Sequence, residues 1–240
     1  MRGGSPVRGN EAYSIVRWLL VIPVRRILPF ILLCLITATA ATARPRKKTQ
    51  QNDATFSYYL LSLSYAPDFC AQRTGNKDAR ECGSGRHIGF VVHGLWPQGE
   101  GNRGPENCGS ASPVSEEIVR ATLSYIPTES LIQHEWATHG TCTGLGAANY
   151  FALVRRARDM VKIPNDLAAP GTQLQMRSAD VEARFAAANP NFPREAFRVS
   201  CYRDAELQEV RIALNKDLSP RVYRNSGGSC GATVQIRPVR

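Results

Sequence analysis

Histidine is scarce in this chain, whose 240 residues include only four copies. A long apolar run is also missing, because the run from Ile27 to Ile36 is short and contains Pro29. A membrane-spanning helix needs about 20 consecutive apolar residues, so this run argues against a transmembrane anchor. No segment repeats at a fixed period. The composition, with 43% hydrophobic residues, is that of a globular protein and excludes disorder throughout.

The N-terminal segment differs from the rest of the chain. Arg25 and Arg26 precede the apolar run, and small residues follow it and end in Ala41-Thr42-Ala43. A charged region, an apolar region and an A-x-A site are typical of a secretory signal peptide. We therefore expect residues 1–43 to be a signal peptide and residues 44–53 a flexible basic leader. After removal of the signal, no stable membrane anchor is expected.

Cysteine usage indicates an oxidising compartment. Cys34 lies inside the signal segment, and bulky Leu32 and Leu33 before it disfavour a lipoprotein anchor. The six remaining cysteines are an even number, which implies disulfides in an exported chain and allows fifteen connectivities. The simplest pairing joins neighbours along the sequence: Cys70–Cys82, Cys108–Cys142 and Cys201–Cys230.

The chain is strongly basic, with a formal net charge of +10. A basic surface favours polyanionic partners such as nucleic acid or an acidic membrane face. The net charge alone does not show whether the protein binds such a partner, because a basic surface can also have no binding role.

Strands and helices alternate irregularly along the sequence. Strands are predicted at 56–65 and 88–92, the second of which would deliver His93 at its C-terminal end, and a strand pair at 197–214. Residues 71–86 and 99–109 are rich in turn formers. Helices are predicted to begin at Ser112 with Pro113 in the first turn, near Thr128 with an end at Gly140, and over 147–163 and 179–188. This order favours an α+β fold with a central, mainly antiparallel sheet and several packed helices in one domain, residues 54–240.

Three of the four histidines fall in two short segments. His93 opens the first, His93-Gly94-Leu95-Trp96-Pro97-Gln98, and the second reads His134-Glu135-Trp136-Ala137-Thr138-His139-Gly140-Thr141-Cys142. A clustered set with Trp, Gly and Glu indicates a catalytic site, whereas His87, alone in a polar loop, is given no role.

The spacing of these residues restricts the chemistry. A helical zinc protease motif needs histidines at i and i+4, but His134 and His139 are five apart and diverge by roughly 140° around a helix. A metal site is therefore disfavoured. A nucleophilic Cys142 conflicts with an even set of disulfides.

Glu135 and His139 share a helical face, where a carboxylate raises a histidine pKa and orients the ring. With His93, the site would hold two histidines for proton transfer between oxygens, and His134 would add charge for a phosphate.

The two segments resemble the paired active-site signatures of the RNase T2 family of secreted acid endoribonucleases, approximately H-G-L-W-P and H-E-W-x-K-H-G-T-C. The resemblance spans roughly residues 56–230 and implies cleavage of single-stranded RNA without metal or cofactor. It implies that His139 is the base that takes the proton of the ribose 2′-OH and that His93 is the acid that protonates the leaving 5′-oxygen. The reaction would pass through a 2′,3′-cyclic phosphate and end in 3′-phosphates. His134 would bind the phosphate, Glu135 would assist the transition state and Trp96 would stack on a base. DNA, which has no 2′-OH, would not react.

Three positions depart from or vary within the family pattern. Thr138 stands where the family usually has a lysine tied to transition-state charge, so the rate is expected to be lower unless an arginine from elsewhere substitutes. Tyr65 stands where tryptophan is more usual, and Gln98 lies where base preference is tuned.

These observations lead to one interpretation and two rivals. We expect a secreted or periplasmic, monomeric, disulfide-bonded endoribonuclease of broad base specificity, whose partner is RNA. One rival is a catalytically weak protein of the same fold that binds RNA or other polyanions, because Thr138 lacks charge. The other, a metal-dependent phosphoesterase, is disfavoured by the histidine spacing.

Overall fold

The computed structural model describes residues 55–72, 78–101, 103–224 and 230–240. The predicted signal peptide at 1–43 and leader at 44–53 lie outside these residues. Within the described part, no helix is both long and apolar enough to cross a membrane.

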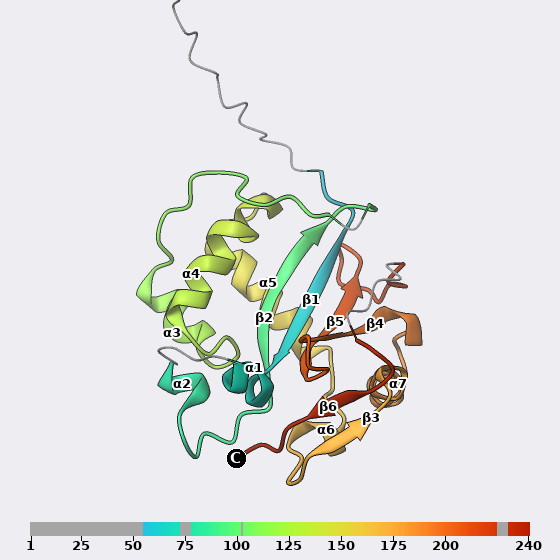
Figure 1. The fold of residues 1–240 in the computed structure, drawn as a ribbon. Helices are drawn as coiled ribbons and strands as arrows, with labels where there is room; N and C mark the ends of the chain where they lie inside the picture. Colours follow the sequence, from blue (N-terminus) through green and yellow to red (C-terminus); the bar gives the residue numbers. More distant parts are fainter. Residues whose placement is uncertain (1–54, 73–77, 102, 225–229) are drawn as a thin grey trace, which may run out of the picture. The chain divides into compact units, whose positions relative to one another are not determined.

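Four antiparallel strands form the central sheet, in the order β2-β1-β5-β4 (Figure 1). Their bounds are β1 Tyr58–Tyr65, β2 Phe90–Gln98, β4 Phe197–Cys201 and β5 Leu207–Leu214. The antiparallel sheet and the α+β class are as predicted. A second sheet of two strands, β3 (Leu174–Met176) and β6 (Val234–Ile236), was not anticipated, because three residues are too few to show a period of two.

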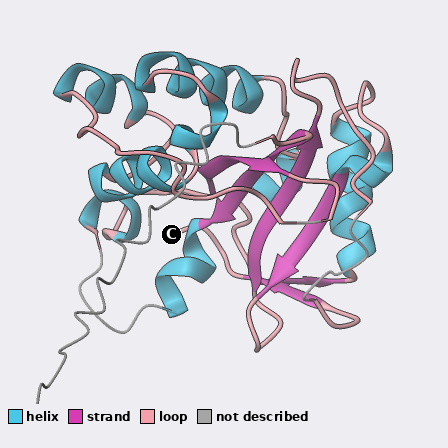
Figure 2. Ribbon diagram, turned by 90° about the horizontal axis from the view of Figure 1, so that it is seen from above, coloured by secondary structure: helices cyan, strands magenta, loops and turns pink. Residues whose placement is uncertain are grey.

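Helices surround the sheet (Figure 2). The longer ones are α3 Glu116–Thr122, α4 Glu129–Thr138, α5 Ala147–Asp159 and α7 Ser178–Ala188. The short ones are α1 Ala66–Gln72, α2 Ala79–Cys82, α6 Asn165–Ala168 and the 3-10 turns η1 Gly140–Thr143 and η2 Arg194–Ala196. The turn-rich prediction for 71–86 was therefore incomplete, since α2 and the end of α1 lie there.

The two faces of the sheet differ in character. Successive strand side chains point to opposite faces, so β1 divides into two sets. The first set joins the main core together with apolar residues of the longer helices: Tyr59, Leu61, Leu63 and Tyr65. The second set lines the other face: Tyr58, Leu60, Ser62 and Ser64. The two buried serines make the second face of β1 more polar than its core face.

Tertiary hydrogen bonds move two helix ends away from their predicted positions. Helix α3 begins after Ser115 rather than Ser112, because the side chain of Gln133 binds both the N–H (2.8 Å) and the carbonyl (3.2 Å) of Val114. Helix α5 ends at Asp159 rather than 163, and the side chain of Asn189 binds the N–H (2.7 Å) and the carbonyl (2.8 Å) of Lys162. These contacts hold the flanking residues outside the helices.

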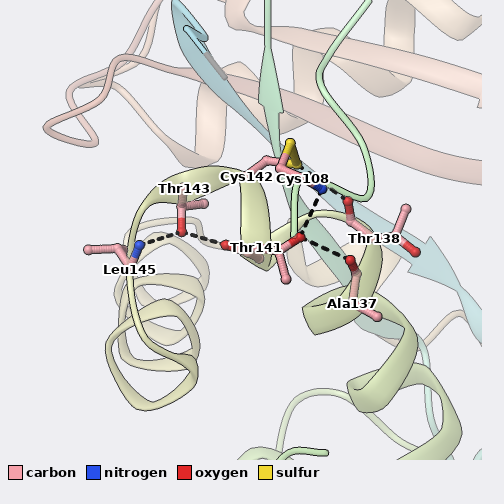
Figure 3. Close-up of a disulfide and its surroundings, with 8 residues drawn as sticks. Cys108, Ala137, Thr138, Thr141, Cys142, Thr143 and Leu145 are labelled. Atoms are coloured by element: carbon pink, nitrogen blue, oxygen red, sulfur yellow. Dashed lines mark hydrogen bonds between the residues drawn. A yellow bond between two sulfur atoms is a disulfide. The ribbon is translucent and has the colours of Figure 1, made fainter. Parts of the chain in front are cut away.

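Three disulfides link Cys70 to Cys82, Cys108 to Cys142 and Cys201 to Cys230, which is the pairing of neighbours that we expected. The middle bridge attaches the loop after β2 to the 3-10 turn η1, which follows α4 (Figure 3). Two hydrogen bonds accompany it: Asn107 N–H to the Thr138 carbonyl (2.8 Å) and Cys108 N–H to Thr141 Oγ1 (3.3 Å).

Removal of the middle bridge is expected to destabilise the protein more than removal of the first. The Cys108–Cys142 loop spans 34 residues and the Cys70–Cys82 loop 12. The entropy of loop closure gives losses of about 4 and about 3 kcal/mol in the free energy of unfolding. Both losses in the free energy of unfolding can be measured by urea denaturation of two variants, in each of which the two cysteines of one bridge are replaced by serine. An equal or smaller loss for Cys108→Ser/Cys142→Ser would contradict the expected order.

Candidate active site

A β-bulge in strand β2 places His93 on the second face of the sheet. Ser62 of β1 is opposite Gly94 and Leu63 is opposite Val92, so His93 is the extra residue in the ladder. Without the bulge, His93 and Trp96, three residues apart, would point to opposite faces. With it, their ring centroids are 5.1 Å apart. The prediction that His93 ends its strand was wrong, because β2 continues through the bulge to Gln98.

Helix α4 delivers Glu135 against this bulge. The helix begins as predicted: Thr128 caps it by accepting a hydrogen bond from Leu131 N–H (3.2 Å). One turn later, Glu135 is 1% exposed and its Oε2 accepts a hydrogen bond from Trp96 Nε1 (2.9 Å). A Cβ at residue 94 would collide with the Glu135 carboxylate, so only Gly94 lets the helix approach this closely. Glu135 Oε1 lies 3.8 Å from His93 Nε2.

His139 leaves helix α4 at its C-terminal cap and faces the same tryptophan. Its ring centroid is 5.5 Å from that of Trp96 and 6.4 Å from that of His134. The helix ends at Thr138, two residues before the predicted Gly140, which starts a 3-10 turn. The glycine with a positive φ is Gly144, which follows that turn. Gly140 is required for space, because Trp136 and Tyr150 pack where a Cβ would lie.

Strand β5 contributes two charged residues that the sequence analysis missed. Glu209 Oε1 lies 2.5 Å from His93 Nδ1, and Glu209 Oε2 accepts a hydrogen bond from Arg211 Nε (2.9 Å). Both residues belong to a strand that reads as an ordinary core strand. The sequence did contain one indication of their role. Glu209 and Arg211 carry opposite charges two residues apart in an otherwise apolar strand, and this spacing places both side chains on one face.

The two catalytic candidates have opposite electrostatic surroundings. Burial by itself lowers the pKa of His93, but the hydrogen bond and charge of Glu209, with Glu135, raise this pKa overall above 6.5. For His139, burial and the nearby His134 and His93 lower the pKa to about 4. The expectation that Glu135 raises the pKa of His139 was therefore wrong. At mildly acidic pH, His93 carries a proton and His139 is free to accept one.

The two carboxylates of the site also differ. Burial raises the pKa of Glu135 to about 7, although the charge of His93 and the hydrogen bond from Trp96 lower it. Burial opposes ionisation of Glu209 as well, but the bonds from His93 and Arg211 lower its pKa to about 2. Glu135 Oε1 and His139 Nδ1 are buried and have no hydrogen-bond partner among the described residues. The hydrogen-bonding capacity of these two buried atoms is therefore not met by the described side chains and backbone.

Two cavities of about 480 Å³ each adjoin these residues. His93, His134 and Glu209 line the first, together with Phe69 and Tyr202. Trp96, Gln98, His139, Arg211 and Tyr223 line part of the second. In the described part of the chain, no group of three or more His, Cys, Asp or Glu residues is arranged to hold a metal ion.

A family model, the ribonuclease T2 family, matches residues 56–223, which is more than half of the chain. The chain belongs to the ribonuclease T2 family. Its resemblance to that family, predicted from the two histidine segments, is confirmed.

Individual relatives agree with this membership. A ribonuclease of Aeromonas hydrophila is 30% identical over 207 residues, which cover 77% of this chain and 87% of that protein. A probable ribonuclease of Haemophilus influenzae is 34% identical over 128 residues, 48% of this chain; the match spans only 47% of that relative. The solved structure of trichomaglin, described as an S-like ribonuclease, has the same fold, with a TM-score of 0.63, 19% identity and coverage of 78% of this chain and 100% of that one.

The positions that differ from the usual pattern of the ribonuclease T2 family have distinct surroundings. Thr138 Oγ1 lies 3.5 Å from His134 Nδ1 at the edge of the site and contributes no charge. The Tyr65 side chain faces the main core, and its hydroxyl donates to the Arg237 carbonyl (2.6 Å), away from the histidines. Gln98 lines the cavity beside Trp96.

The contrast between the two histidines predicts distinct NMR titrations. The His139 imidazole is expected to titrate near pH 4 and the His93 imidazole above 6.5. Replacement of Glu209 by Gln removes the negative charge beside Nδ1, so the pKa of His93 should fall, whereas that of His139 should change little. A His93 pKa unchanged in Glu209→Gln would refute the assignment of Glu209 as its partner.

Proposed function

We propose that this member of the ribonuclease T2 family is an endoribonuclease that cleaves single-stranded RNA by metal-independent transesterification, with broad base specificity. The observation that carries the proposal is the pairing of His93 and His139 around Trp96 with opposite protonation preferences. Transfer of a phosphoryl group between two oxygens needs one acid and one base, each in the correct state at the same pH.

The first step forms a cyclic product. Neutral His139 accepts the proton of the ribose 2′-OH, whose oxygen attacks the adjacent phosphorus. Protonated His93 donates to the departing 5′-oxygen, and the P–O5′ bond breaks to leave a 2′,3′-cyclic phosphate. In the slower second step the roles reverse, and water opens the ring to a 3′-phosphate.

Glu135 and His134 act on the phosphate. With a pKa of about 7, Glu135 carries a proton at mildly acidic pH, so it can donate a hydrogen bond to a phosphoryl oxygen instead of repelling it. The exposed His134 adds positive charge at the mouth of the first cavity. Together they oppose the negative charge that grows on the phosphoryl oxygens in the transition state.

Aromatic side chains are suited to hold the bases. The Trp96 ring is fixed by the hydrogen bond to Glu135 and borders the cavity that also contains Tyr223. Stacking on such rings contributes about 1–3 kcal/mol per base and tolerates any sequence, which supports broad specificity. DNA lacks the attacking 2′-OH, so we propose that it is not cleaved. The chain is proposed to act as a monomer.

We also propose that the protein is secreted or periplasmic. Three disulfides are typical of oxidising compartments, and residues 1–43 have the pattern of a signal peptide. The mass of the mature protein purified from its native compartment should correspond to a chain that begins near residue 44. A mature protein that retains the apolar run would contradict export by this route.

RNA digestion in EDTA tests the activity. The wild-type chain should cleave single-stranded RNA to 2′,3′-cyclic ends and leave DNA intact, whereas His93→Ala and His139→Ala should each lose on the order of 10³-fold or more in kcat. His87→Ala, a histidine outside the site, is the matched control and should retain full activity. Metal dependence or DNA cleavage would refute the mechanism, and RNA binding without cleavage would favour the polyanion-binding alternative.

A further inference from the structure

Arg211 is placed beside the reacting groups by the register of the sheet. On the second face, Arg211 of β5 is opposite Ser62 of β1, which is in turn opposite Gly94 of β2. The Arg211 guanidinium carbon lies 5.6 Å from the Trp96 ring centroid. Because Trp96 is a neighbour of both His93 and His139, this cation approaches the place where the two histidines would act on a phosphate.

Glu209 fixes the orientation of the Arg211 guanidinium. It binds only Nε of Arg211, at 2.9 Å, while its other oxygen is 2.5 Å from His93 Nδ1. The two terminal amino groups of Arg211 have no hydrogen-bond partner among the described residues. The side chain is one-third exposed and lines the cavity that His139 also lines. A fixed, partly buried guanidinium with two free terminal amino groups is suited to bind a phosphate through two parallel hydrogen bonds.

Two other arginines near this face, Arg221 and Arg198, are already engaged. Arg221 binds both oxygens of Glu100 (2.8 and 2.7 Å) and stacks over Tyr58. Arg198 is directly opposite Arg211 on β4, but its guanidinium binds Glu182 (3.5 Å). Of these three, Arg211 alone is held next to His93.

We propose that Arg211 is a catalytic residue whose terminal amino groups bind the phosphoryl oxygens of the scissile group and stabilise their charge in the transition state. Glu209 positions Arg211 and His93 together. The proposal rests on the proposed ribonuclease function and gives the site the cation that neutral Thr138 does not supply. The charges of Glu209 and Arg211 cancel, so a protonated His93 leaves the trio with a net positive charge toward the phosphate.

Arg211→Gln tests this role, with Arg198→Gln as the matched control. The substrate is a short single-stranded oligoribonucleotide in EDTA, and urea denaturation verifies the fold of each variant. Arg211→Gln should lower kcat on the order of 10²-fold with a smaller change in KM, because the contact strengthens in the transition state. Arg211→Lys should retain more activity than Arg211→Gln, and Arg198→Gln should match the wild type.

A lysine at position 138 separates direct binding from a structural role. Thr138→Lys places a cation beside His134, so it should raise kcat of Arg211→Gln about tenfold but change the wild type by less than about threefold. Loss of Arg211 also removes a positive neighbour of His93, so the alkaline limb of the pH–rate profile should move to higher pH. If Arg211→Gln instead acted by disrupting the Glu209–His93 contact, the alkaline limb would move to lower pH.

The outcomes separate this proposal from the function on which it rests. A wild-type chain that does not cleave RNA would overturn both. An active wild type with kcat of Arg211→Gln within about twofold, an alkaline limb that moves down, or an equal gain from Thr138→Lys with and without Arg211 would overturn the role of Arg211 alone.

Discussion

One extra residue in strand β2 determines how this site is built. Because side chains alternate along a strand, a regular β2 could not present both His93 and Trp96 to the same face. The bulge at His93 corrects this, and Gly94 leaves the space through which the Glu135 carboxylate of α4 reaches the Trp96 N–H. The remaining groups of the site are arranged around these residues: β5 supplies charge from one side, and the end of α4 supplies His139 from the other.

The different behaviour of two chemically identical side chains follows from this arrangement. Both His93 and His139 are partly buried, which favours the neutral ring in each. His93 has an ionised Glu209 at hydrogen-bond distance, which outweighs its burial. At His139, burial lowers the pKa, and the neighbouring His134 and His93 lower it further. In the proposed mechanism, the roles of acid and base thus follow from the neighbours that β5 and α4 supply and not from the histidines themselves.

Local patterns predicted much of the fold and part of the site. The alternation of β1, the Thr128 cap and the two histidine segments depend on residues close together in the sequence, and all were recognisable. The errors arose where distant residues decide: Gln133 and Asn189 displaced two helix ends, and a bulge moved His93 into the middle of its strand. Glu209 lies 116 residues from His93, so no motif around either residue could reveal their contact.

Contacts between residues that are distant in the sequence also affect how the neutral Thr138 is interpreted. A cation that stabilises a phosphate is not tied to one position in the sequence, because only its location relative to the phosphorus matters for the electrostatic energy. The short sequence motif on helix α4 includes the stabilising cation when it is a lysine of that helix. The motif cannot show a cation that strand β5 contributes. Arg211 approaches the site across the sheet, and Glu209, already required by His93, orients it at little additional cost. A helix-based motif that lacks its lysine is therefore weak evidence for lost catalysis unless the facing strand also lacks a cation.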